Sequence, residues 1–361
     1  MKTLLITLEF PPFKGGVASY YSNLVKYWPL GEKIDVMDNN HQELMSECGK
    51  FSWLKSVSIL LKALKRPGFD YLLVGQILPL GTVAYLATLI KPFTYGVVLH
   101  GLDFTSAIKS SRKRFLTKLI LKKANKIICA NSRVAQMVRV FDSGLSEKTE
   151  IVNPGIEPII AQPSSESITN LQATYKLHDH FILFTLGRLT LRKGVDSVIK
   201  ALSEWGPEDL KIKYFIAGSG SEEKYLRSLA AVSPLSESIV FLGEINEDEK
   251  WLWLHACDLF IMPAREIGND FEGFGIVYLE ANLAGKMVVA GNSGGVKDAV
   301  EEGVSGFLVD PENISEIKNL IIKLKNNKDL LFNMGKRGRE RAITNFNWEK
   351  QSERLCHIIK K

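Results

Sequence analysis

The sequence has few cysteines, and none is spaced for a disulfide framework or a metal site. The 361 residues include Cys48, Cys129, Cys257 and Cys356, which lie far apart and form no Cys-x-x-Cys pair. This spacing argues against disulfides and zinc and is typical of a reducing compartment. We expect all four cysteines to be small buried hydrophobic residues.

A cleavable leader and a long hydrophobic run are also missing. Met1–Thr7 is largely apolar, but Glu9 ends the run and no small-residue cleavage site follows, so we expect a buried strand there. The longest apolar stretch elsewhere, Leu78–Ile90, contains Pro79 and Gly81 and is too short to span a bilayer. These absences favour a cytoplasmic location.

Two further signatures are absent. No Gly-x-Gly-x-x-Gly motif opens either half of the chain, which argues against an NAD-dependent dehydrogenase. No Asp-x-Asp motif ends a strand in the second half, which is consistent with a site that uses no metal.

Composition indicates a globular protein of two domains. Apolar residues make up 45% and charged residues 24%, and 361 residues are too many for one α/β core. The net charge of +6 is uneven: residues 1–165 carry 21 Lys and Arg against 12 Asp and Glu, whereas residues 166–361 carry 25 against 28. The basic first half suggests an anionic substrate or surface facing it.

Short apolar runs alternate with helical patterns throughout the chain, which predicts parallel sheets covered on both faces. The runs expected to form strands are Leu4–Leu8, Tyr71–Val74, Gly96–Leu99, Lys126–Ala130, Phe181–Leu186, Lys213–Ala217, Ile239–Leu242, Leu259–Met262 and Met287–Ala290. Residues 157–170, rich in Pro, Ser and Glu, are the predicted linker, with domains at 1–165 and 166–345. Two doubly wound sheets in tandem are expected to face one cleft with their carboxyl ends.

A basic motif follows the predicted strand Phe181–Leu186. Gly187 and Arg188 come directly after it, and Lys193 lies five residues further on, at the start of the next helix. Free N–H groups and the helix dipole already favour anions at such a turn, so two added cations predict a pyrophosphate site. The alternative is a pair of solvated surface charges.

A second motif has glutamates eight residues apart, Glu272 and Glu280. The glycines after Glu272 let a ligand approach the backbone, and Gly275 precedes a predicted helix whose start is a second anion site. One carboxylate could reach a sugar and the other a ribose diol, because the backbone positions of the two glutamates would lie about 12 Å apart. That separation argues against a glycosidase, whose carboxylates lie about 5–10 Å apart. The alternative is an acid at a helix start and an unrelated surface acid.

Several weaker signals lie at other strand ends. Gly15-Gly16 could adopt positive φ and expose N–H groups to a phosphate, or form a plain tight turn. His100 could donate a hydrogen bond to a sugar hydroxyl, or be structural. The loops at Gly218 and Ile245 could expose backbone groups to a nucleobase.

Together these motifs resemble the family-4 retaining glycosyltransferases, which have the GT-B fold. The matching elements appear in the family's order and are Gly15-Gly16, His100-Gly101, Gly187-Arg188-x4-Lys193-Gly194, Gly218-x-Gly220, Glu272-x7-Glu280 and Ser293-Gly294-Gly295. The opening Glu9–Pro12 and the run Glu272–Ala290 look closest to bacterial mannosyltransferases acting on phosphatidylinositol mannosides. The resemblance implies a C-terminal helix, about 346–361, that crosses back onto the first domain.

The resemblance also implies roles for individual residues. The catalytic set would be Arg188 and Lys193 on the donor pyrophosphate, Glu272 on the donor sugar and His100 on its 6-hydroxyl. The rest of the nucleotide-sugar site would be Gly15, Gly16, Gly187, Gly218, Ile245, Phe274, Gly275, Ile276 and Glu280, with Glu280 on the ribose. No cofactor or metal is implied beyond the nucleotide-sugar donor.

The donor and acceptor stay open. The resemblance favours GDP-mannose as the donor, with a UDP-sugar as the alternative. The acceptor would be lipid-linked or a glycan. The competing hypothesis of another class is a non-catalytic protein that binds a nucleotide-sugar. Asp298, where the family usually has Glu, and the inverted order Asn153-Pro154-Gly155 depart from the family pattern.

The segment Lys109–Lys126 carries eight Lys and Arg residues and no acid, interleaved with Phe115, Leu116, Leu119 and Ile120. It predicts either a solvated helix packed by its apolar stripe or a helix lying on an anionic membrane. Nucleic acid is the weaker explanation, because no recognised binding motif accompanies the charge.

Overall fold

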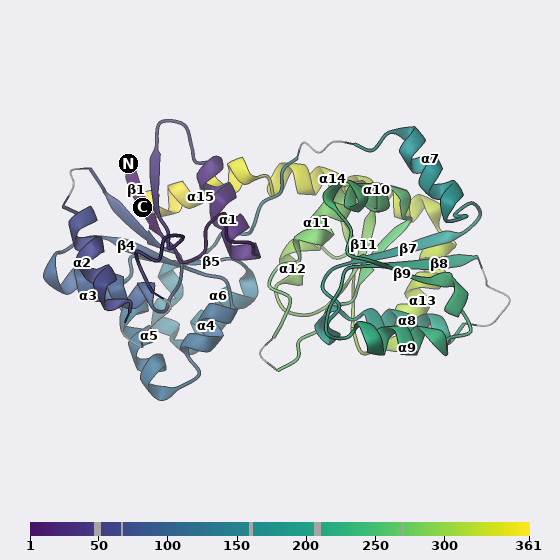
Figure 1. The fold of residues 1–361 in the computed structure, drawn as a ribbon, viewed down its shortest axis with the longest axis horizontal. Coiled ribbons are helices and arrows are strands. Elements are labelled where there is room, and N and C mark those ends of the chain that lie inside the picture. The colour runs from purple at the N-terminus through teal and green to yellow at the C-terminus, as the bar shows by residue number, and fades with distance from the viewer. Residues whose placement is uncertain (47–51, 66–67, 159–161, 206–210, 269) are drawn as a thin grey trace. The chain divides into compact units, whose positions relative to one another are not determined.

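A computed structural model describes residues 1–361 except 47–51, 66–67, 159–161, 206–210 and 269, so Cys48 and part of the predicted linker lie outside the described residues. The chain forms two compact units (Figure 1). The first unit is Met1–Gly155 with Phe346–Lys361, and the second unit is Ile156–Asn345. The amino-terminal segment of the first unit therefore ends at Gly155, ahead of the predicted boundary at residue 165.

The predicted linker ends inside a helix. Residues 165–170 of the predicted linker belong to the helix α7 (Ser165–Thr174), which begins where the side chain of Ser164 accepts a hydrogen bond from the N–H of Ser167 at 3.0 Å. Helix α7 packs against α10 (Glu247–Ala256) of the second unit. The sequence did not predict this helix, because α7 has no buried residue and therefore no strong apolar periodicity, and its composition is typical of a linker.

The first unit has a six-stranded sheet in the order β2-β1-β3-β4-β5-β6, with every neighbouring pair parallel. Its strands are β1 (Lys2–Ile6), β2 (Lys33–Met37), β3 (Tyr71–Val74), β4 (Tyr95–Leu99), β5 (Lys126–Cys129) and β6 (Thr149–Ile151). Its helices include α1 (Gly16–Lys26), α2 (Leu54–Ala63), α3 (Leu80–Ile90), α4 (Leu102–Ala107), α5 (Ser111–Lys123), α6 (Ser132–Phe141) and α15 (Trp348–Lys360). Strands β2 and β6 were not predicted, because they are edge strands without a continuous apolar run.

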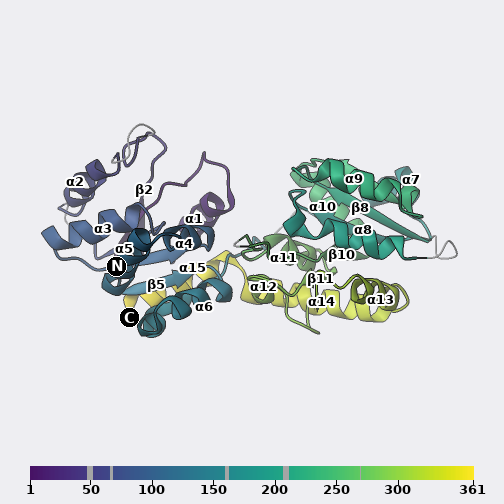
Figure 2. The same cartoon turned by 90° about the horizontal axis from the view of Figure 1, so that it is seen from below.

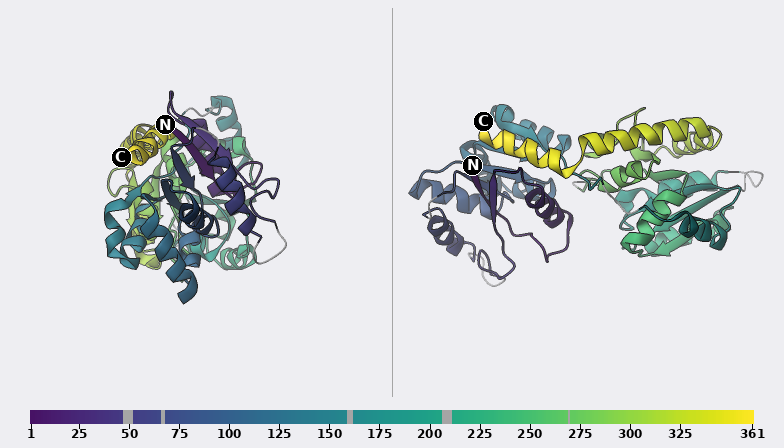
Figure 3. Two further views of the ribbon diagram at one scale, coloured as in Figure 1. Left: turned by 90° about the vertical axis from the view of Figure 1, so that its left-hand side faces the viewer. Right: turned by 90° about the horizontal axis from the view of Figure 1, so that it is seen from above.

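Helix α15 joins the core of the first unit. Trp348 and Leu355 pack in the same cluster as Tyr20, and a Cβ on Gly155 would come within 2.8 Å of the Trp348 ring. The amino-terminal ammonium and Lys360 both form ion pairs with Glu32, at 2.7 and 2.6 Å. The two ends of the chain accordingly lie near each other in Figure 3.

The second unit has a six-stranded parallel sheet in the order β12-β11-β10-β7-β8-β9, with helices on both faces (Figures 1 and 2). Its strands are β7 (Phe181–Leu186), β8 (Ile212–Ala217), β9 (Ile239–Gly243), β10 (Leu259–Met262), β11 (Met287–Gly291) and β12 (Gly306–Val309). Its other helices include α8 (Val195–Ser203), α9 (Glu223–Ala231), α11 (Ile276–Leu283), α12 (Val296–Ala299), α13 (Ile314–Lys325) and α14 (Lys328–Asn345). The predicted α/β class of two doubly wound parallel sheets is confirmed.

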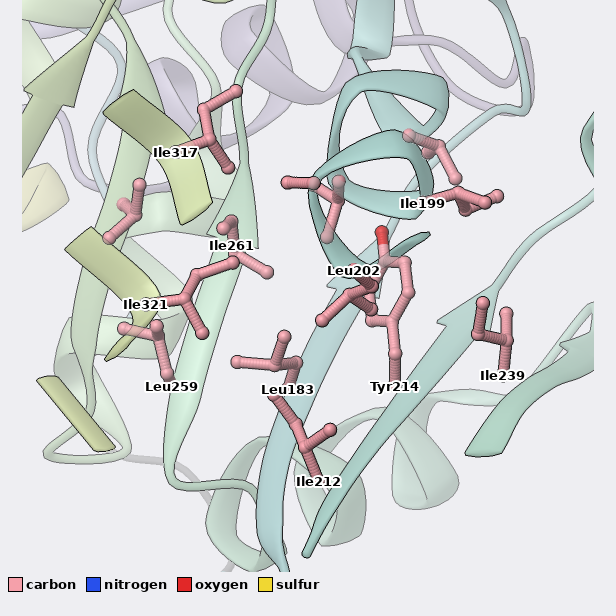
Figure 4. Close-up of a cluster of buried hydrophobic side chains, with 14 of the residues drawn as sticks. Leu183, Ile199, Leu202, Ile212, Tyr214, Ile239, Leu259, Ile261, Ile317 and Ile321 are labelled. Carbon is pink, nitrogen blue, oxygen red and sulfur yellow. The ribbon is translucent and has the colours of Figure 1, made fainter. Parts of the chain in front are cut away.

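A continuous hydrophobic core holds this sheet against its helices. Figure 4 shows Leu183 and Leu259 from neighbouring strands lying against Leu202 of α8 and Ile321 of α13. All four side chains are essentially fully buried. Because the strands are fixed by this core, the loops at their carboxyl ends hold the polar residues in defined positions. No helix in the described part of the chain is long and apolar enough to cross a membrane.

Candidate functional site

The basic motif after β7 forms a short 3₁₀ turn that leads into α8. Arg188 is exposed and forms no ion pair with any described residue. Lys193 ends the turn, and its Nζ would lie 3.5 Å from a Cβ on Gly187, so the ammonium sits over the backbone at the strand end. Gly194 has φ of 71°, and a Cβ there would come within 2.0 Å of the Pro263 carbonyl oxygen. Only glycine permits this close approach of the turn to the loop after β10.

Lys193 and Arg192 meet on the carboxylate of Glu272. The Lys193 Nζ lies 2.7 Å and the Arg192 Nη1 2.5 Å from the same Oε2, and the three side chains are only 11–12% exposed. The Arg192 Nε also lies 3.2 Å from Asp270. Although burial opposes ionisation, the charges and hydrogen bonds of Lys193 and Arg192 hold the pKa of Glu272 below its usual value.

Arg192 was not predicted as a site residue. It stands directly before Lys193, so the sequence already showed a third cation in the same turn that could have been predicted as part of the site. Its partner lies 80 residues away in sequence, so the contact itself could not be read from the motif.

Glycines fix the segment that carries Glu272. The N–H of Gly295 donates to the Glu272 carbonyl oxygen at 2.9 Å, and Gly294, with φ of 58°, leaves no room for a Cβ beside that oxygen. Gly275, with φ of 77°, precedes α11 and lies so close to the Tyr278 ring that a Cβ would be 2.4 Å away. Gly275 was predicted to admit a ligand, and in the structure all three glycines also let the segment pack closely against its own chain.

Glu280 lies on α11 and has its own cation. Its Oε1 lies 2.7 Å from the Nζ of Lys250 on α10, which also binds Glu247 at 2.5 Å. Burial lowers the pKa of Lys250, but the two glutamates outweigh this and raise it above its usual value. Glu272 and Glu280 thus have separate cation partners. Lys250 was also not predicted.

Among the remaining predicted residues of the second unit, Gly218 and Ile245 follow strands as expected, whereas Phe274 and Ile276 lie at the start of α11. Gly218 follows β8, with φ of 123°, and a Cβ on it would come within 2.0 Å of the Gly187 carbonyl oxygen, so the loops after β7 and β8 touch. Ile245 lies between β9 and α10 and is half-buried. Phe274 is buried, whereas Ile276 is 38% exposed at the start of α11.

In the first unit, Gly15 and Gly16 do not adopt the left-handed conformation that glycine permits, which was one of the two interpretations of this pair. Gly15 is extended, with φ of 168°, and Gly16 begins α1. Both are exposed, and nothing described lies within 4 Å of a Cβ built on Gly16. The absent side chain therefore leaves open space at the start of α1.

His100 directly follows β4 and is surrounded by polar and aromatic groups. Its Nε2 lies 2.9 Å from the hydroxyl of Tyr21, and its backbone N–H donates to Asp103 at 3.0 Å. Burial lowers the pKa of His100 to about 4. Burial also raises the pKa of Asp103 to about 6, although backbone N–H groups that donate to it act in the opposite direction. Tyr21 was not predicted.

The basic segment forms helix α5 and the residues around it. Ile120 and Leu121 are fully buried, whereas Phe115 is 67% exposed, so the predicted apolar stripe is only partly covered. Lys118 is neutralised by Asp142 at 3.1 Å. Arg112, Lys113 and Lys123 are exposed on the same helix.

These features place the protein in a known class. Residues 168–341 match the family described as Glycosyl transferases group 1, and the two sheets have the GT-B architecture. The protein is a glycosyltransferase with a group 1 domain in its second unit.

Similar proteins cover nearly the whole chain. A GDP-mannose-dependent monoacylated alpha-(1-6)-phosphatidylinositol monomannoside mannosyltransferase of Corynebacterium glutamicum is 28% identical over 99% of this chain and 97% of its own. A GDP-mannose-dependent alpha-(1-6)-phosphatidylinositol monomannoside mannosyltransferase of Mycobacterium tuberculosis is 24% identical over 99% and 98%. Among solved structures, Anabaena Alr3699/HepE in complex with UDP aligns over 100% of both chains, with a TM-score of 0.80 and 21% identity.

Proposed function

We propose that this glycosyltransferase moves mannose from GDP-mannose to a lipid-linked or glycan acceptor, with retention and without a metal. The choice of donor is supported by full-length similarity to two GDP-mannose-dependent enzymes. The observation that carries the chemistry is the buried cluster of two cations on Glu272 at the start of α8. A UDP-sugar is the alternative donor, favoured by the similarity of fold to a UDP complex.

The cluster suggests how a diphosphate would be held. Without a ligand, Glu272 neutralises Lys193 and Arg192. An incoming diphosphate would compete for Lys193 and bind the exposed Arg188 and the free N–H groups of α8. Glu272, partly released from Lys193, would then accept hydrogen bonds from the donor sugar.

The same groups would lower the barrier to transfer. Cleavage of the glycosyl–phosphate bond leaves negative charge on the departing diphosphate, and preorganised cations stabilise that charge without a metal ion. Glu280, oriented by Lys250, would accept hydrogen bonds from the ribose hydroxyls. Ile245 would present backbone atoms to the base, and His100 would contact the donor sugar.

A thermal-shift screen tests the donor. We expect GDP-mannose, in the presence of a chelator, to raise the melting temperature more than UDP-glucose does. A larger shift with UDP-sugars would overturn the donor assignment. Transfer of labelled mannose to a lipid extract would then test the lipid-linked acceptor.

We also propose that α5 lies on an anionic membrane surface. Exposed cations beside the exposed ring of Phe115 are the combination that binds such a surface. We expect sedimentation with phosphatidylglycerol vesicles but not with phosphatidylcholine vesicles, and loss of binding in Arg112→Glu/Lys113→Glu. The control Lys224→Glu/Lys336→Glu makes the same change in net charge on exposed helices of the second unit. Equal binding by both double variants would refute the assignment to α5.

A further inference from the structure

The ring of His100 lies against two tyrosines of α1. Tyr20 and Tyr21 both meet it edge-on, with ring centroids 5.0 and 5.3 Å away. Tyr21 also forms the hydrogen bond at 2.9 Å between its Oη and the histidine Nε2. The same Oη donates to the carbonyl oxygen of Gly75 at 2.5 Å.

These two hydrogen bonds determine where the imidazole proton lies. A tyrosine hydroxyl has a single proton, and a carbonyl oxygen can only accept. The hydroxyl proton of Tyr21 therefore points at Gly75, and Nε2 of His100 has to donate to the Tyr21 oxygen. In a neutral imidazole with Nε2 protonated, Nδ1 keeps its lone pair. No residue in the described parts of the chain forms a hydrogen bond with Nδ1.

We propose that Tyr21 is a positioning residue that fixes this tautomer, so that Nδ1 of His100 accepts a hydrogen bond from a hydroxyl of the donor sugar. The proposal rests on the proposed function. It reverses the direction of the bond predicted from sequence, in which His100 donates. It also defines a preference, because a hydroxyl can donate to Nδ1 whereas the carboxylate of a uronic-acid donor has no proton to give and is repelled.

The surroundings keep the ring neutral near physiological pH. Burial lowers the pKa of His100 to about 4. The other titratable groups around the two rings are Asp103 on α4, Glu9 in the loop after β1, Cys129 on β5 and Tyr20 on α1. Asp103 accepts from the backbone N–H of His100, not from its ring, so it leaves the tautomer to Tyr21.

Nuclear magnetic resonance tests the tautomer without any donor. Long-range ¹H–¹⁵N correlation at pH 7 reports which nitrogen is protonated in each of the six histidines, and His100→Gln assigns the His100 signals. We expect protonated Nε2 in the wild type and a mixture of tautomers in Tyr21→Phe. The matched control is Tyr20→Phe, which removes a buried hydroxyl one residue away whose bond goes to Val152, and it should keep the wild-type tautomer. A protonated Nδ1 in the wild type, or an unchanged tautomer in Tyr21→Phe, would overturn the proposal.

Kinetics tests the consequence for transfer. Tyr21→Phe should lower kcat/KM with GDP-mannose by about tenfold, because a buried donor loses its acceptor. Tyr20→Phe should stay within about twofold of the wild type, since its hydroxyl does not touch the imidazole. An equal loss in both variants would indicate general packing damage and overturn the role of Tyr21. If the wild type transfers no sugar, the proposed function fails, whereas the resonance experiment still decides the tautomer.

Discussion

Replacing Glu272 by Gln removes one negative charge from the centre of the candidate phosphate site. The side chain is 11% exposed and lies within 2.7 Å of both Lys193 and Arg192, whereas Asp270, the other acid on Arg192, is 57% exposed. Removing one partner of a buried ion pair typically costs about 3–5 kcal/mol. Gln keeps a hydrogen-bonding oxygen, so we expect the lower end of this range, about 3 kcal/mol, or roughly 6–12 °C in melting temperature for a unit of this size.

The matched control is Glu223→Gln. Glu223 forms an ion pair with Arg227 at 2.8 Å, but the two side chains are 31% and 50% exposed. An exposed pair of this kind contributes about 0.5 kcal/mol or less. If the two variants lose equal stability in thermal or urea unfolding, the reasoning about the buried cluster is wrong.

The same substitution should separate nucleotide binding from transfer. With Glu272 neutral, Lys193 and Arg192 are less compensated, so GDP should stabilise the variant at least as much as it stabilises the wild type. Transfer should fall by about 100-fold, because a group aimed at the reacting sugar is lost. A smaller stabilisation by GDP in the variant would refute the assignment of Lys193 to the diphosphate.

The pH dependence of stability has a defined sign. Burial would raise the pKa of Glu272, but the neighbouring cations lower it overall. Ionised Glu272 therefore stabilises the folded state fully above the usual carboxyl pKa of 4.5. That contribution is lost as the pH falls through the lowered folded-state value. Unfolding experiments between neutral and acid pH should therefore show a steeper loss of stability in the wild type than in Glu272→Gln.

Two further substitutions test the supporting contacts. Gly194→Ala would push a Cβ into the Pro263 carbonyl from a backbone with φ of 71°, so we expect a loss of several kcal/mol in unfolding experiments or failure to fold; an unperturbed melting temperature would contradict the close approach. Lys250→Met would leave Glu280 without its cation, so we expect KM for the donor to rise several-fold while kcat changes less; a fall in kcat alone would argue against a ribose-orienting role.

The sequence by itself determined the class of fold and the positions of most strands. Leu259–Met262 is apolar throughout, and Phe181–Leu186 is apolar except for Thr185, so their composition identifies buried parallel strands. It also determined that Lys193 lies where a strand turns into a helix, because that position depends on local chain geometry.

Only the tertiary structure decided which charges meet. Arg192 reaches Glu272 across 80 residues, and Lys250 reaches Glu280 across 30. The tautomer of His100 likewise depends on Tyr21, 79 residues away. Such contacts leave no local period, because each partner is positioned by a different strand or helix and the contact exists only once the sheet has formed.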